Sequence, residues 1–149
     1  MNAGLVAQRQ GDVNQALADY EAAAAKAPDN VYAHYDLGVI YQQRGATNDA
    51  ATQYRQALLL DPKFVDALYN MGVLEAPVNP ASAVDYYTKD LQVQPTNAAA
   101  NFNLGVLLIK RGGTTQGYYY LRRGLRLNPA LRADIPPGVS VPSTTTTKA

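Results

Sequence analysis

The chain has 149 residues, 47% of them hydrophobic and 17% charged, with no cysteine and one histidine. This length suits one domain, and the missing thiols exclude disulfides, cysteine-ligated metal sites and thiol nucleophiles. The net charge is +1, but residues 1–90 carry 6 basic and 11 acidic side chains, whereas residues 91–149 carry 7 and 1. This separation favours contacts with charged partners or between chain ends. No apolar run approaches the roughly 18 residues that cross a bilayer, so we expect no membrane insertion.

Apolar residues recur at helical spacing in successive stretches separated by glycine or proline, and nothing predicts a strand. The predicted helices, in chain order, span residues 12–26, 31–44, 48–60, 65–75, 81–94, 98–111 and 115–127. Asn79 followed by Pro80 is typical of an N-cap and a first helical residue. The segment 112–115, Gly-Gly-Thr-Thr, is predicted to be a turn with a threonine cap, because a phosphate-binding loop would need a preceding strand.

Four series of residues repeat along the chain with a period of 33 or 34. Glycine occurs at positions 4, 38, 72 and 105, and a small residue at positions 16, 50, 83 and 117. Tyrosine or leucine occurs at positions 20, 54, 87 and 121, and proline at positions 28, 62, 95 and 129. The agreement of four series predicts repeated copies of a helix pair, of which the first is incomplete.

These copies resemble the tetratricopeptide repeat, whose pattern is W-x2-L-G-x2-Y, then A-x3-F, then P. The second copy reads His34-x2-Leu37-Gly38-x2-Tyr41, Ala50-x3-Tyr54, Pro62. The resemblance implies an all-α fold, a right-handed superhelical solenoid of antiparallel helix pairs in which neighbouring copies bury one another's apolar faces. We expect one solenoid over residues 1–131, with a partial copy at 1–30 and full copies at 31–64, 65–97 and 98–131. Glu75 and Asp90 replace the usual tyrosine and alanine, which should weaken the third copy locally.

The last predicted helix leaves apolar residues without a following helix to cover them. We expect Leu131 and Ile135 to fold back over this helix, together with Val139, as a short cap. Without such a cap, a second chain should bury the same face. The rest of residues 132–149 is rich in proline and threonine and is predicted to be a flexible tail.

The resemblance also implies that the first helix of each pair lines a concave groove. The matching positions in the second copy are Tyr32, Tyr35, Asp36, Val39, Gln42 and Gln43. Those in the third copy are Asp66, Tyr69, Asn70, Val73 and Ala76, and those in the fourth are Ala99, Phe102, Asn103, Val106, Ile109 and Lys110. The partial first copy contributes Asn2, Leu5, Gln8 and Arg9.

Two series in this predicted groove favour an extended peptide as ligand. Tyr35, Tyr69 and Phe102 share one repeat position, and the next position holds Asn2, Asp36, Asn70 and Asn103. Aromatic rings offer apolar area, and an amide both donates to and accepts from a peptide backbone. The alternative is that the aromatic rings pack between helices, although asparagine has no packing reason to recur. Family members that bind a C-terminal carboxylate use a lysine, asparagine and arginine clamp, which Tyr35, Val39 and Asn70 do not reproduce.

Two further features have simple structural interpretations. His34 occupies the usual tryptophan position without a second histidine or cysteine, so it is predicted to pack between helices rather than bind metal. A basic cluster with three tyrosines would suit nucleic acid; its basic members are Lys110, Arg111, Arg122, Arg123, Arg126 and Arg132. Helix-dipole and tyrosine–arginine contacts explain it better, so nucleic acid is not the expected partner.

The sequence therefore predicts a non-catalytic protein–protein interaction module that binds a peptide or partner protein without cofactor or metal. Two alternatives stay open: a scaffold that assembles by end-to-end stacking, giving a homo-oligomer, and the recognition arm of a larger enzyme. The chain begins inside a helix, so we expect it to belong to a longer protein. Bacterial proteins of similar type place such repeats outside the membrane behind an N-terminal anchor, so either a cytoplasmic or an extracytoplasmic location is compatible.

Overall fold

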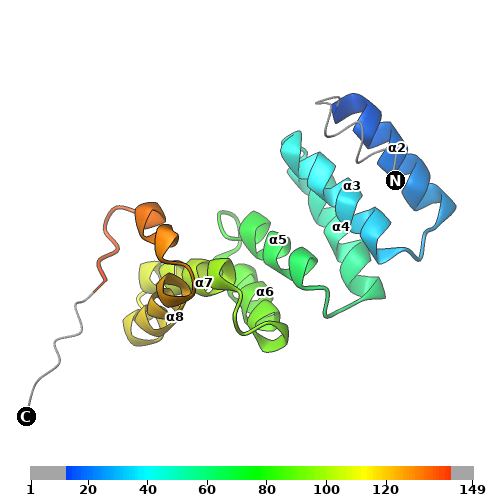
Figure 1. Ribbon diagram of the computed structural model, residues 1–149. Coiled ribbons are helices and arrows are strands. Elements are labelled where there is room, and N and C mark those ends of the chain that lie inside the picture. Colours follow the sequence, from blue (N-terminus) through cyan, green and yellow to red (C-terminus); the bar gives the residue numbers. More distant parts are fainter. Residues whose placement is uncertain (1–12, 142–149) are drawn as a thin grey trace, which may run out of the picture. The chain divides into compact units, whose positions relative to one another are not determined.

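The computed structural model of this chain describes residues 13–141, which form seven α-helices and one 3-10 helix and include no strand (Figure 1). The all-α prediction is therefore confirmed for this part of the chain. Two compact units are present, Met1–Leu74 and Glu75–Ala149, called here the N-terminal and C-terminal units. The expectation of one solenoid over residues 1–131 concerns how these units are joined, and it stays a prediction.

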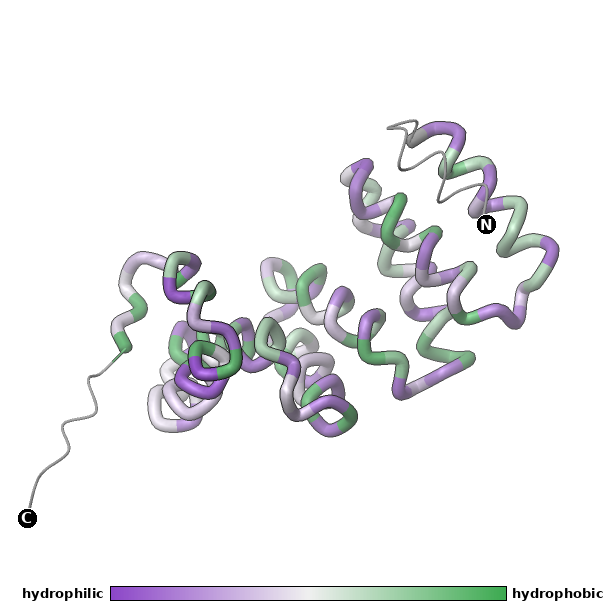
Figure 2. The backbone as a smooth tube through the Cα atoms, viewed as in Figure 1, coloured by the Kyte–Doolittle hydropathy of each residue, from purple (hydrophilic) through white to green (hydrophobic). Residues whose placement is uncertain are grey.

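The helices of the N-terminal unit follow the predicted ranges to within one residue. They are α2 (Val13–Lys26), α3 (Val31–Gln43), α4 (Thr47–Leu60) and α5 (Val65–Glu75), the last ending at the boundary with the next unit. Figure 2 shows polar and apolar residues alternating within each helix, as expected of helices with one buried face.

Small residues allow the helices of the N-terminal unit to pack closely. Ala16, Tyr20 and Ala24 of α2 form a buried cluster with apolar residues of α3. Ala50 of α4 is fully buried, and so is Tyr54 one turn later. A Cβ atom added at Gly38 would lie 2.6 Å from the Tyr54 ring. Glycine at this repeat position therefore makes room for the tyrosine of the paired helix.

The C-terminal unit contains α6 (Pro80–Val93), α7 (Ala98–Lys110), α8 (Thr114–Leu127) and the 3-10 helix η1 (Pro129–Asp134). Gly105 of α7 and Gly117 and Gly124 of α8 allow these two helices to come into close contact. A Cβ atom on Gly105 would lie 2.7 Å from Leu121 Cα, and one on Gly124 would lie 2.7 Å from the Phe102 amide nitrogen. Glycine inside a helix lowers its intrinsic stability by about 1 kcal/mol, which here is offset by closer packing of the pair.

The ends of the helices confirm one predicted cap and contradict another. Asn79 caps α6 by accepting from the Ser82 amide at 3.2 Å, and Pro80 is the first helical residue. The predicted threonine cap of α8 is wrong, because Gly113 is its N-cap residue and no side chain caps it. Gly112 has a φ of +86°, so the turn finishes one residue earlier and Thr114 already lies inside the helix.

The C-terminal cap has the predicted contacts. Val139 is buried with Phe102, Leu121 and Leu125, and the partly buried Leu131 and Ile135 pack against this cluster. Val141 does so as well. The prediction that Leu131 and Ile135 fold back over the last helix is confirmed, and Val139 joins them. The remaining tail, 142–149, lies outside the described residues.

Asp90, where the sequence predicts local weakening, takes part in a hydrogen-bonded link between α6 and α7, and the weakening itself stays a prediction. Asp90 is fully buried near the end of α6. The Asn97 side-chain amide donates to its two carboxylate oxygens at 3.0 and 2.9 Å, while the Asn97 side-chain oxygen caps α7 by accepting from the Ala100 amide at 3.2 Å. One asparagine therefore both starts α7 and solvates a buried carboxylate.

Candidate functional site

Three of the predicted groove residues converge on the buried side chain of Tyr54. The Tyr54 hydroxyl donates to Gln42 Oε1 at 2.7 Å, and it accepts from Asn70 Nδ2 at 3.2 Å. The Tyr35 ring lies 5.9 Å from the Tyr54 ring, centroid to centroid. Tyr54 of α4 thus holds side chains from α3 and α5 in fixed positions.

Tyr54 and Asn70 are 16 residues apart. The same spacing between a buried tyrosine and a polar residue recurs at two other places in the chain. Asn103 Nδ2 lies 3.4 Å from the Tyr87 hydroxyl, to which it donates. Tyr20 has Asp36 in the equivalent position. Burial raises the pKa of Tyr20, and the negative charge of Asp36 raises it further. The asparagines at positions 70 and 103 therefore do have a packing reason to recur, and the argument that they lack one is wrong. They satisfy the hydroxyl of a buried tyrosine.

Burial and neighbouring carboxylates raise the pKa values of side chains in this region. Burial raises the pKa of Tyr35, the charges of Asp66 and Asp36 raise it further, and a hydrogen bond with Asn70 opposes them. Burial also raises the pKa of Asp36 above its ordinary value, and it raises the pKa of Tyr54 strongly. The surroundings of Tyr35 thus disfavour negative charge.

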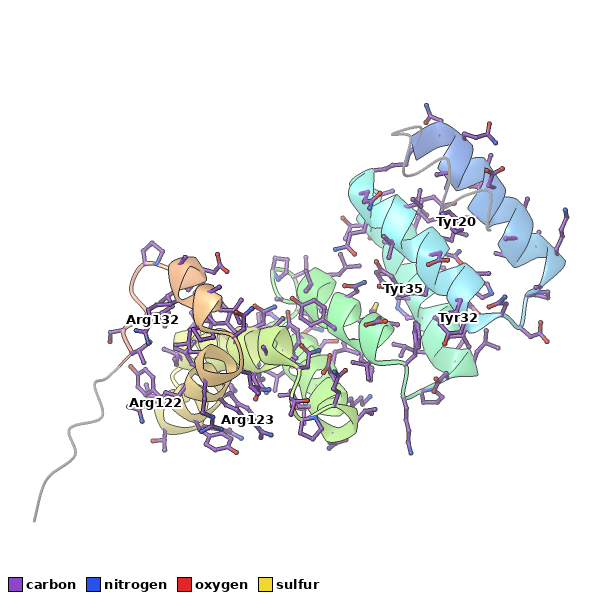
Figure 3. The ribbon with its side chains drawn as sticks, in the orientation of Figure 1. Tyr20, Tyr32, Tyr35, Arg122, Arg123 and Arg132 are labelled. Carbon is purple, nitrogen blue, oxygen red and sulfur yellow. The ribbon has the colours of Figure 1, made fainter. Side chains whose placement is uncertain are left out.

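An exposed aromatic side chain lies beside these residues. Tyr32, also on α3, is 66% exposed, and Figure 3 labels it with Tyr35 on the same helix. The ring of Phe64, in the turn before α5, makes edge contacts with both: its centroid lies 5.4 Å from that of Tyr32 and 5.2 Å from that of Tyr35. Sequence reasoning missed Phe64 because it lies between helices. The sequence feature that could have indicated Phe64 is a large apolar residue in an otherwise polar turn.

In the C-terminal unit, the aromatic ring at the equivalent repeat position is covered rather than accessible. Phe102, predicted to present its ring to a ligand, is only 6% exposed because the cap residues cover it. Val106 also packs against this cluster. Asn103 is half-buried and Lys110 is exposed. The prediction that Phe102 contributes an open aromatic surface is therefore not supported while the cap is in place.

The remaining predicted positions are partly accessible or lie outside the described residues. Val39, Tyr69, Val73 and Ala76 are half-buried, whereas Gln43 and Asp66 are exposed. Asn2, Leu5, Gln8 and Arg9 lie outside the described residues. The groove as a whole would use helices from both units, so it stays a prediction.

His34 has the structural role that the sequence predicted. Its Nε2 donates to the Pro28 carbonyl oxygen at 2.9 Å, and its Nδ1 lies 2.9 Å from Gln53 Oε1. The ring thereby connects α3 with α4 and with the turn before α3. Within residues 13–141 no three His, Asp or Glu side chains are grouped to hold a metal ion, and no helix there has the length and apolar character needed to cross a membrane.

The side chains of the basic cluster are exposed, except that of Arg123, which is half-buried. Figure 3 shows Arg122 and Arg123 on α8 and Arg132 on η1. Arg123 Nη1 donates to the Tyr119 hydroxyl at 3.4 Å, one turn earlier in α8, and the Tyr119 ring lies 5.1 Å from that of Tyr120 in an edge contact. The Tyr119–Arg123 pairing predicted at one-turn spacing is present, as a hydrogen bond to the hydroxyl.

Comparison with known proteins supports the repeat assignment. The family model of the TPR (tetratricopeptide) repeat matches residues 8–45 and 40–75. No curated protein matches the chain. The solved structure of MamA superposes with a TM-score of 0.81 at 23% identity, covering 89% of this chain and 79% of that chain.

Two further solved structures are similar to the chain. PilW, described as a widely conserved type IV pilus biogenesis factor, has a TM-score of 0.74 at 30% identity, covering 85% of this chain but 59% of its own. YrrB, described as a TPR protein with an unusual peptide-binding site, has a TM-score of 0.77 at 20% identity, covering 89% of this chain and 68% of its own. These neighbours share the solenoid fold of packed helix pairs. The family model thus identifies tetratricopeptide repeats over residues 8–75, and the solved structures show the same helical fold over most of the chain.

Proposed function

We propose that this chain is a non-catalytic module that holds a peptide segment of a partner protein, chiefly on α3 and α5 of the N-terminal unit. Tetratricopeptide repeats in general mediate protein–protein interactions, which supports the class of function. The observation that carries the finer proposal is the exposed Tyr32 ring beside half-buried Tyr35 and Asn70, all of them supported by packed side chains.

The arrangement suits binding because its polar groups are already oriented. Asn70 is fixed by Tyr54, and Tyr35 is fixed between the rings of Tyr54 and Phe64. A ligand that meets side chains held in this way loses less conformational entropy than one that must order them. Tyr32 and Tyr69 add apolar area from side chains with few rotatable bonds.

Chemistry on the same surface argues for binding rather than catalysis. A phenol on this surface would act as a nucleophile if its pKa were lowered or a base activated it, whereas burial and nearby carboxylates raise the pKa of Tyr35. His34, the chain's one histidine, is engaged with the Pro28 carbonyl and Gln53. The repeat family is also typically non-catalytic.

The expected ligand can be found with a displayed library of random short peptides selected on the immobilised chain. We expect binders whose affinity falls about tenfold or more with Tyr32→Ala, since an aromatic anchor at an interface typically contributes ~2 kcal/mol. Tyr119→Ala is the matched control, because Tyr119 is 58% exposed on α8 of the other unit. Binders affected only by Tyr119→Ala would contradict the proposal and place the site on the basic cluster. Circular dichroism melting checks that each variant is folded.

The alternative of a self-assembling scaffold makes a different prediction. End-to-end stacking through the C-terminal unit would need the face formed by Phe102, Leu121 and Leu125, which residues 131–141 already cover. Concentration-dependent association of the full chain would favour the scaffold, and a monomer that binds selected peptides would favour the peptide-binding module.

A further inference from the structure

The carboxylate of Asp36 differs from its counterparts in the other repeats. Asn70 and Asn103 each donate to the hydroxyl of the buried tyrosine 16 residues earlier in the chain. Asp36, in the equivalent place beside Tyr20, has neither a hydrogen bond nor an ion pair among residues 13–141. Burial raises its pKa, so the folded chain keeps a partly desolvated charge that its described neighbours do not neutralise. Such a charge is stabilised by a cation supplied from outside.

The surroundings of Asp36 favour a particular kind of cation. Asp36 and Asp66 both act electrostatically on Tyr35, so two carboxylates lie near one aromatic ring. The same ring is in edge contact with Phe64, which in turn contacts the exposed Tyr32. A surface that combines aromatic faces with carboxylates matches a flat cation that can stack on a ring and donate two hydrogen bonds at once.

Charge complementarity extends over the two helices that carry the surface. α3 (VYAHYDLGVIYQQ) and α5 (VDALYNMGVLE) contain acidic residues and neither lysine nor arginine. A ligand lying along α3 and α5 therefore meets negative charge without competition from lysine or arginine on those helices. The potential of such a surface raises the rate at which a basic ligand associates.

We infer that the surface formed by Tyr32, Tyr35, Asp36, Phe64 and Asp66, here called the acidic aromatic surface, binds an arginine side chain of the partner peptide. The guanidinium stacks on the exposed aromatic face and donates to Asp36, with Asp66 adding attraction from the rim. This inference rests on the proposed function and names the chemistry of its ligand. Lysine would bind more weakly, because an ammonium ion is compact and cannot donate as a flat fork.

The composition of the peptides selected from the displayed library tests the inference. We expect arginine to be enriched among them. In fluorescence anisotropy with a selected peptide, replacing that arginine by citrulline, which keeps the shape but removes the charge, should weaken binding about tenfold or more. Asp36→Asn should weaken binding of the arginine peptide to a similar extent and should leave the citrulline peptide nearly unaffected. Asp85→Asn is the matched control, because Asp85 is exposed on α6.

The outcomes separate this inference from the proposed function. Binders that depend on Tyr32 but carry no excess of arginine overturn the inference and leave the proposed function standing. A library without binders overturns both. If Asp36→Asn does not fold, Asp66→Asn, at an exposed position, makes the same test with a smaller expected effect. Self-association of the chain that Arg122→Ala with Arg123→Ala abolishes would identify a second copy as the occupant, and it would overturn the assignment to a separate partner.

Discussion

At the scale of single residues, buried tyrosines organise the side chains around them. The Tyr54 hydroxyl accepts a hydrogen bond from Asn70 of the following helix, and the Tyr87 hydroxyl accepts one from Asn103, which is likewise 16 residues later. A buried hydroxyl without a partner would cost ~1–3 kcal/mol, so these asparagines contribute to stability as well as to the candidate surface. Asn70→Ala should therefore affect both folding and binding, which makes Tyr32 the cleaner position for testing function.

Gly105 tests how closely α7 and α8 must approach. We expect Gly105→Ala to lower the free energy of unfolding by roughly 1–3 kcal/mol, because its methyl group would meet backbone atoms of Leu121 and Gly117, which cannot rotate away. Urea denaturation followed by circular dichroism measures the change. Gln116→Ala, at an exposed position of α8, should be nearly neutral. An unchanged midpoint for Gly105→Ala would show that the two helices can separate without loss.

Asp36 predicts a dependence of stability on pH. Burial raises the pKa of its carboxyl in the folded chain above the unfolded value, so ionisation favours the unfolded state. The resulting loss of stability is fully present above the folded pKa, and it disappears as the pH falls below the unfolded pKa. Asp36→Asn should thus stabilise the ligand-free chain at neutral pH, and this gain should shrink in acid. Thermal melting across acidic and neutral pH checks this. A variant that is less stable at neutral pH would contradict it.

At the scale of elements, two of the first helices, α3 and α7, begin at an asparagine that follows a proline-containing turn. Asn30 caps α3 by accepting from the Tyr32 and Ala33 amides, and Asn97 caps α7 in the corresponding copy. Only Asn97 has a second task, since its amide also donates to the fully buried Asp90. The two caps are therefore a matched pair that differs by one buried carboxylate.

This pair gives a prediction at the element scale. Asn30→Ala should lower the free energy of unfolding by about 1 kcal/mol, the usual value of an N-cap. Asn97→Ala should lower it by about 3 kcal/mol or more, because it also removes two hydrogen bonds from a buried charge. Chemical denaturation of both variants measures the difference. Equal losses would show that Asp90 is solvated by other groups, and adding Asp90→Ala to Asn97→Ala should recover part of the loss.

At the scale of the whole molecule, the C-terminal cap replaces the helix that would begin a further repeat. Leu131, Ile135 and Val139 cover apolar residues of α7 and α8 that an additional copy would otherwise bury. The same contacts remove Phe102 from the candidate surface.

Truncation tests the cap directly. A chain ending at Asn128 should associate or melt at a lower temperature, because the face around Phe102, Leu121 and Leu125 becomes exposed to water. A chain ending at Val141, which keeps every cap residue, is the control and should behave like the full chain. Sedimentation velocity and thermal melting distinguish the two. A chain ending at Asn128 that is monomeric and melts unchanged would remove both the cap and the association face.

The repeat period, the limits of the helices within residues 13–141 to about one residue and the presence of a cap were determined by the sequence alone. Glycine, alanine, tyrosine and proline recur because each is required locally, at a close approach, a filled gap or a helix end, so the pattern is visible without coordinates. The partners of Asp90, Asn70 and Phe102 were decided only in three dimensions. Asn97 reaches Asp90, Asn70 reaches Tyr54, and Val139 covers Phe102, because these contacts depend on how helices pack and side chains point. Local periodicity carries no information about that direction, and for the same reason Phe64 became part of the candidate surface only once the turn before α5 was placed against α3.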